Sequence, residues 1–129
     1  MNQKLILVVE NNSLIALDLK MICRELGHNC YSATYNNDTL TKISEVNPDL
    51  VLMDIKLDKK QNIIDEAERI CDEFRIPIIF FTTAARDSYQ NSRLQNRCLF
   101  QPIPFTTEEI IEAIEKLFRN FPYNAESLR

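Results

Sequence analysis

Short apolar runs alternate along the chain with segments whose apolar residues recur at helical spacing. A continuous apolar run of four or five residues is typical of a strand that is covered on both faces of a parallel sheet. The stronger runs of this kind are Leu5–Val9, Leu50–Met53 and Pro77–Phe81. Weaker strand patterns occupy Asn29–Thr34 and Leu99–Phe100.

The segments between the strands have helical character. Asn12 and Ser13 offer capping oxygens to the first helix, Gly27 ends it, and Asn47-Pro48 ends the second, because a residue before proline avoids the helical region. The predicted helices are Leu14–Leu26, Thr39–Val46, Ile63–Phe74, Arg86–Arg97 and Thr106–Phe118. Five strands alternating with five helices predict right-handed crossovers and an α/β fold, a doubly wound parallel sheet flanked by helices.

The size and composition suit a single globular domain. The chain has 129 residues, of which 45% are hydrophobic and 26% charged, and its net charge is −4. We expect residues 1–120 to form this domain and residues 121–129 to form a C-terminal tail, too short for an effector domain. Because Lys and Arg are not clustered, direct nucleic-acid binding is not expected.

Neither a membrane span nor an exported, disulfide-bonded protein is predicted. The chain lacks an apolar stretch of about 18–20 residues and a small-residue cleavage site near its N-terminus. Four cysteines lie far apart without a C-x-x-C pair, so we expect reduced thiols in a cytoplasmic protein. The single histidine, His28, is expected to be solvated rather than a ligand.

Glycine is nearly absent, and this excludes one large class of function. Gly27 is the only glycine, whereas average usage near 7% would give about nine. Glycine-rich phosphate loops, and with them the usual dinucleotide, flavin and P-loop binders, are therefore not expected. The turns are expected to use asparagine, which tolerates positive φ, at Asn11-Asn12, Asn36-Asn37 and Asn62.

Polar residues follow the predicted strands at their carboxyl ends, which is where ligands bind in open α/β sheets. Glu10-Asn11, Asp54, Thr82 and the Pro102–Pro104 segment occupy these ends. Carboxylates and a hydroxyl around one pocket suit Mg²⁺ and a phosphoryl group. Asp54 is then placed to attack a phosphorus electrophile.

The residues at these strand ends resemble the motifs of the receiver domain of two-component response regulators, over residues 4–119. The motifs are Val8-Val9-Glu10-Asn11, Asp49 to Ile55, Ile76 to Thr82, and Pro104 to Glu109. The resemblance implies a flavodoxin-like, five-stranded sheet of order 2-1-3-4-5. It also implies a signalling module that accepts a phosphoryl group on its own aspartate and is not a turnover enzyme.

The resemblance assigns a role to each matching position. Asp54 would be the phosphoryl acceptor, and Mg²⁺ would be held by Glu10, Asp54 and the backbone carbonyl of Lys56. Thr82 would bond a phosphoryl oxygen, and Phe100 would occupy the aromatic switch position. The implied partners are a histidine kinase or phosphotransfer protein and a downstream protein. The last helices and strand would offer the contact surface and a possible homodimer interface.

Two departures from the family pattern lead to a second hypothesis. Asn11 replaces the second acid of the pair, so it would contact Mg²⁺ only weakly, through water. The family lysine is also missing: either Ile103 or Gln101 stands in its place, and Ile103 is preferred because it keeps Phe100 aligned. A charge-assisted bond of about 1.5–3 kcal/mol is thereby lost. The alternative is a degenerate pseudo-receiver that binds a partner without phosphorylation.

Each of these residues also has a purely structural interpretation. Asp54 would then cap the following loop, Glu10 would be solvated at a strand end, and Thr82 would satisfy nearby backbone groups. Phe100 would be an ordinary core residue.

Overall fold

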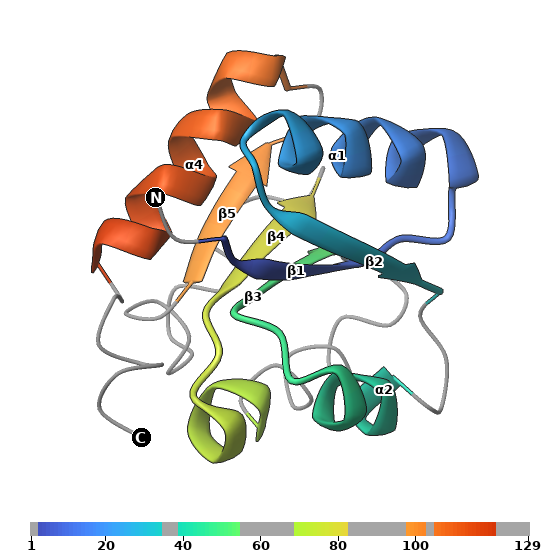
Figure 1. Ribbon diagram of the computed structural model, residues 1–129, viewed down its shortest axis with the longest axis vertical. Coiled ribbons are helices and arrows are strands. Elements are labelled where there is room, and N and C mark those ends of the chain that lie inside the picture. The colour runs from blue at the N-terminus through green and yellow to red at the C-terminus, as the bar shows by residue number, and fades with distance from the viewer. Residues whose placement is uncertain (1–2, 35–38, 55–68, 83–97, 103–104, 121–129) are drawn as a thin grey trace.

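Five parallel strands form the centre of the molecule (Figure 1). The computed structural model describes residues 3–34, 39–54, 69–82, 98–102 and 105–120. The strands lie in the order β2-β1-β3-β4-β5, which matches the order that the family resemblance implies. They are β1 (Leu5–Val9), β2 (Asn29–Ala33), β3 (Leu50–Asp54), β4 (Ile78–Thr82) and β5 (Cys98–Pro102). The prediction of an α/β fold with a parallel sheet is confirmed.

Helices cover both faces of this sheet. The described helical elements are α1 (Ser13–Glu25), α2 (Thr39–Val46), the π-helical turn η2 (Ile70–Phe74) and α4 (Thr107–Asn120). Figure 1 shows α1 and α4 on one face and α2 and η2 on the other. The helix expected over Arg86–Arg97 lies outside the described residues, as does the first part of the one expected over Ile63–Phe74.

Strand alternation divides the core into two layers, because successive side chains point to opposite faces of a sheet. Val8 and Leu52 belong to the cluster under α1 and α4, and their neighbours Val9 and Met53 belong to the cluster over α2 and η2. All four are at most 1% exposed. The central strands therefore have no polar face, as the continuous apolar runs predict.

Side-chain caps fix where the two long helices begin. The Oδ1 atom of Asn12 accepts hydrogen bonds from the N–H groups of Leu14 (3.0 Å) and Ile15 (3.2 Å). Thr106 and Glu109 form a reciprocal capping box at the start of α4. The Glu109 N–H donates to Thr106 Oγ1 (3.1 Å), and the Thr106 N–H donates to Glu109 Oε1 (2.8 Å). The capping role expected of Asn12 is thus confirmed.

Positive φ values occur at positions other than those expected. Asn12 is extended (φ −83°), whereas Asn47 (φ 51°) and Arg75 (φ 57°) are the non-glycine residues with positive φ in the described segments. Asn36-Asn37 and Asn62 lie outside the described residues. The left-handed conformation lets α2 and η2 stop and the chain turn into the next strand.

His28 is half-buried rather than fully solvated, and it links the N-terminal segment to the last helix. Its Nδ1 atom accepts a hydrogen bond from the Lys4 N–H at 3.1 Å. Its ring packs edge-on against the Phe118 ring, with 5.3 Å between the ring centroids. Lys4 Nζ lies 5.8 Å from the centroid of the Phe118 ring. Burial and the Lys4 charge lower the pKa of His28, against the opposing charges of Asp49 and Glu115.

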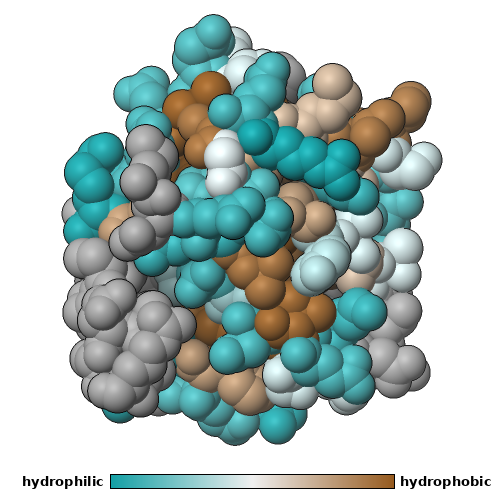
Figure 2. Space-filling view, in the orientation of Figure 1, coloured by the Kyte–Doolittle hydropathy of each residue, from teal (hydrophilic) through white to brown (hydrophobic). Residues whose placement is uncertain are grey.

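The surface is mostly polar, with apolar side chains in small patches (Figure 2). The large apolar side chains that are exposed include Leu14, Leu17 and Met21 on α1 and Tyr31 on β2. No helix in the described segments is long and apolar enough to cross a membrane.

Candidate functional site

The pairing of β1 with β3 brings two carboxylates to one edge of the sheet. Val9 is opposite Met53, so Glu10 and Asp54 come next on adjacent strands. Adjacent strands lie about 4.8 Å apart. Glu10 continues the alternating row of Ile6 and Val8, and Asp54 continues the row of Leu50 and Leu52. Both residues therefore follow rows that face α1 and α4.

Glu10 is a buried acid held at the junction of β1 and α1. Its side chain is only 6% exposed, and its N–H donates to the Ala33 carbonyl at 3.0 Å. Its Oε2 atom accepts the N–H of Asn12 at 2.9 Å, and Asn12 in turn caps α1. A carboxylate at a helix start is stabilised by the unpaired N–H groups there. The cap thus also orients an acid that has no role in apolar packing.

Asp54 is the last residue of β3 and is half-buried. It is opposite Phe81 in β4, whose ring is 1% exposed and packs on Phe105 at 5.2 Å between centroids. Apolar side chains therefore flank the carboxylate on the side of β4. Asn11, the neighbour of Glu10, is exposed. The structure thus brings Glu10 and Asp54 together at the edge that the sequence predicts.

The other predicted site residues are placed only by their backbone or fall outside the described residues. Thr82 ends β4, one residue beyond the Phe81 that pairs with Asp54. Phe100 is opposite Phe80 in the β4–β5 pairing. The side chains of Thr82 and Phe100 are not among those described, and Lys56 and Ile103 lie outside the described residues.

The donor atoms at this edge suit a hard cation. Glu10 and Asp54 supply carboxylate oxygens, and Mg²⁺ is commonly bound through one or two carboxylates with water completing the shell. Across the described segments, no three His, Cys, Asp or Glu side chains are grouped as metal ligands. A complete Mg²⁺ site there would thus need oxygen donors beyond these two acids, such as water or a main-chain carbonyl.

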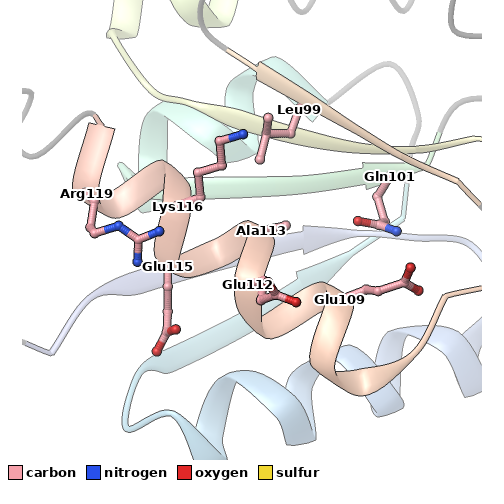
Figure 3. Close-up of a pocket in the computed structure, with 8 residues that line it drawn as sticks. All are labelled: Leu99, Gln101, Glu109, Glu112, Ala113, Glu115, Lys116 and Arg119. Carbon is pink, nitrogen blue, oxygen red and sulfur yellow. The ribbon is translucent and has the colours of Figure 1, made fainter.

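A second surface feature, which the sequence patterns did not indicate, is a groove between β5 and α4 (Figure 3). Its volume is about 460 Å³, and the residues that line it are Leu99, Gln101, Glu109, Glu112, Ala113, Glu115, Lys116 and Arg119. Gln101, one of the two candidates for the position of the family lysine, thus faces α4.

A doubly wound α/β sheet with paired acids at its carboxyl edge defines a class of domain that binds polar ligands there. The chain belongs to the response regulator receiver domain family, whose sequence profile matches residues 6–115. The matched family is one of receiver domains and not of catalytic domains, so the prediction that this domain is a two-component receiver module and not itself a turnover enzyme is confirmed.

One curated relative and two solved structures illustrate the similarity. The transcriptional regulatory protein PdtaR of Mycobacterium tuberculosis is 29% identical over 118 residues, which are 90% of this chain and 57% of PdtaR. The chain thus spans little more than half the length of this relative. A response regulator from Thermotoga maritima has a TM-score of 0.78 at 17% identity, covering 92% of this chain and 99% of that one.

The second structure is the receiver domain of the sensor histidine kinase PA1611 from Pseudomonas aeruginosa. It has a TM-score of 0.67 at 21% identity and covers 92% of this chain and 97% of that one. In that structure a magnesium ion is coordinated in the active-site cleft. At these identities the two structures establish a shared fold.

Proposed function

We propose that this chain is a phosphoacceptor receiver module switched by Mg²⁺-dependent phosphorylation of Asp54. The observation that carries the proposal is the β1–β3 register, which sets Glu10 beside Asp54 at the carboxyl edge of the sheet. The buried acid tethered by the Asn12 N–H and the half-buried acid at the end of β3 both lie outside the two apolar clusters. This arrangement is understandable if the two acids serve a ligand.

In the proposed reaction, a carboxylate oxygen of Asp54 attacks the phosphorus of a donor. The new O–P bond forms as the bond to the donor oxygen or nitrogen breaks, and the donor leaves with that electron pair. Glu10, Asp54 and the main-chain carbonyl of Lys56 would hold Mg²⁺, and the Asn11 side chain would orient a bound water. When bound, the ion supplies positive charge against the acids and the phosphoryl oxygens. The magnesium-containing PA1611 receiver domain supports this part of the proposal.

The response to phosphorylation is assigned to Thr82 and Phe100. The Thr82 hydroxyl would donate to a phosphoryl oxygen, since Thr82 ends the strand next to β3. Phe100, in the neighbouring strand β5, occupies the aromatic switch position and would change its orientation when Thr82 binds the phosphoryl group. With Ile103 in place of the family lysine, no ammonium pairs with the phosphoryl group from that position. We therefore expect a weakly populated active state.

The proposed partners are a histidine kinase or phosphotransfer protein and a downstream protein. The proposed location is the cytoplasm, and the proposed receiver domain comprises residues 1–120. The groove between β5 and α4 supports a contact or homodimer surface on that side (Figure 3). Glu109 and Glu112 lie on α4 together with Lys116 and Arg119. A surface that carries both signs of charge can pair with a copy of itself about a two-fold axis.

The decisive experiment is intact-mass analysis after incubation with acetyl phosphate, with and without Mg²⁺. The expected result is a gain of one phosphoryl group that requires Mg²⁺ and is lost in Asp54→Asn. Glu10→Gln, which keeps an acceptor for the Asn12 N–H, should reduce the extent of labelling. Asp18→Asn, an exposed acid on α1, is the matched control and should label like the wild type. Labelling that persists in Asp54→Asn would contradict the assignment.

Asn11 and the missing lysine favour one alternative, a pseudo-receiver that binds its partner without phosphorylation. It predicts no gain in mass from a folded chain under any donor condition. It also predicts equal partner binding by the wild type and Asp54→Asn. Partner binding that depends on the phosphodonor would eliminate it.

A further inference from the structure

Two cysteines that are separate in the sequence lie together in the core. Cys23, near the end of α1, and Cys30, in β2, belong to the same apolar cluster. The intervening turn is closed by the hydrogen bond from the His28 N–H to the Cys23 carbonyl, at 3.0 Å. Both thiols are free, with Cys23 fully buried and Cys30 7% exposed.

The side chains of Cys23 and Cys30 interact within this cluster. The Cys30 sulfhydryl donates a hydrogen bond to the Tyr31 carbonyl at 3.7 Å. The Cys23 side chain lowers the pKa of Cys30 against the opposing effect of burial, and the charges of Lys20 and Arg24 act in the same direction as Cys23. The same interaction, together with burial, raises the pKa of Cys23. Cys30 is thus the more readily ionised of the two thiols, and it is the less buried.

We propose that Cys23 and Cys30 are a reversibly oxidisable pair, which hydrogen peroxide converts to a disulfide between α1 and β2. In the first step the Cys30 thiolate attacks one peroxide oxygen, the O–O bond breaks, and hydroxide leaves, giving Cys30 sulfenic acid. In the second step the Cys23 sulfur attacks the Cys30 sulfur and releases the sulfenic oxygen as water. In total, two thiols and one peroxide give one disulfide and two waters.

The two-layered core makes the pairing specific. Cys71 is buried in the cluster on the opposite face of the sheet, so the strands separate it from Cys23 and Cys30. A small oxidant suits the site because Cys30 lies in the edge strand β2 and presents little surface. The proposal needs neither Mg²⁺ nor Asp54 and stands independently of the proposed function.

The sequence allows the cross-link to be assigned without ambiguity. Trypsin cuts after Lys20 and Arg24, so the two cysteines fall in different peptides, residues 21–24 and 25–42. Cys71 and Cys98 fall in two further peptides, residues 70–75 and 98–116. The reduced, folded wild type is treated with hydrogen peroxide, quenched, alkylated in denaturant and digested.

The expected result is one cross-link, between peptides 21–24 and 25–42. Titratable thiols should fall from four to two per chain, and dithiothreitol should restore them. Cys71→Ser should behave like the wild type, and Cys23→Ser should stop at a sulfenic acid on Cys30 that dimedone traps. A different peptide pairing, a disulfide between chains, sulfinic acid on Cys30 without a cross-link, or four unchanged thiols would each overturn the proposal. The wild-type peptide map decides the matter even if Cys23→Ser does not fold.

Discussion

Removing the side-chain cap of α4 tests how this helix is fixed to the sheet. In Thr106→Ala, the Glu109 N–H loses its bond to Oγ1, whereas the main-chain N–H of residue 106 can still donate to the Glu109 carboxylate. Loss of an N-cap side chain costs about 1 kcal/mol, within a range of about 0.5–2 kcal/mol. The free energy of unfolding should fall by that amount, because Ile110, Ile114 and Leu117 bind α4 to the core only while the helix is formed.

Urea unfolding followed by circular dichroism measures the effect. With a urea m-value of about 2 kcal/mol/M, a loss of about 1 kcal/mol lowers the midpoint by about 0.5 M. Thr107→Ala is the matched control, since Thr107 is an exposed neighbour outside the capping box, and its effect should stay within about 0.5 kcal/mol. Glu109→Gln, which keeps an acceptor for the Thr106 N–H, should lose less than Glu109→Ala. Equal midpoints for the two threonine variants would refute the reasoning.

Three further predictions concern backbone conformation and pH. Gly27→Ala should destabilise the fold by about 1 kcal/mol in thermal unfolding, because φ is +90° there although the space beside it is open. Arg75→Gly should have the opposite sign or no effect, since Arg75 has φ 57° and ψ 43°. The lowered pKa of His28 means that the unfolded chain binds more protons. The free energy of unfolding should therefore fall as pH decreases from about 6.5 through the folded-state pKa, and then level off. His28→Asn should flatten this slope in urea titrations at each pH.

Local patterns were sufficient for most of the sheet and for the acidic edge. Continuous apolar runs mark β1, β3 and β4 because these strands are buried on both faces. Strand ends then place Glu10 and Asp54, because the carboxyl ends of parallel strands share one edge. The segment Thr39–Val46 was predicted with the bounds that the structure has.

Features that depend on contacts between distant segments were not visible in such patterns. The hydrogen bond from the Lys4 N–H to His28 joins the residue before β1 to the residue before β2. Nothing near His28 in the sequence indicates this bond. β5 is longer than the predicted Leu99–Phe100 because its ladder with β4 extends pairing to Pro102. Proline lacks an N–H to donate but is tolerated in an edge strand. The hydrophobic pattern places Glu10 and Asp54 at the edge of the sheet. It does not show which other side chains surround these two acids, because those side chains come from segments that the pattern does not position.

The interior position of β1, between β2 and β3, has a consequence for how the protein is made. β1 is synthesised before β2 and β3, yet it must pair with β2 on one side and β3 on the other, and Ile6 is opposite both Cys30 and Leu50. On the ribosome, the apolar side chains of β1 therefore stay incompletely buried until β3 has been synthesised and can pair with β1. Folding rates fall when native contacts join residues that are distant in sequence. The interval before closure is when this chain is most exposed to wrong partners and most in need of chaperones.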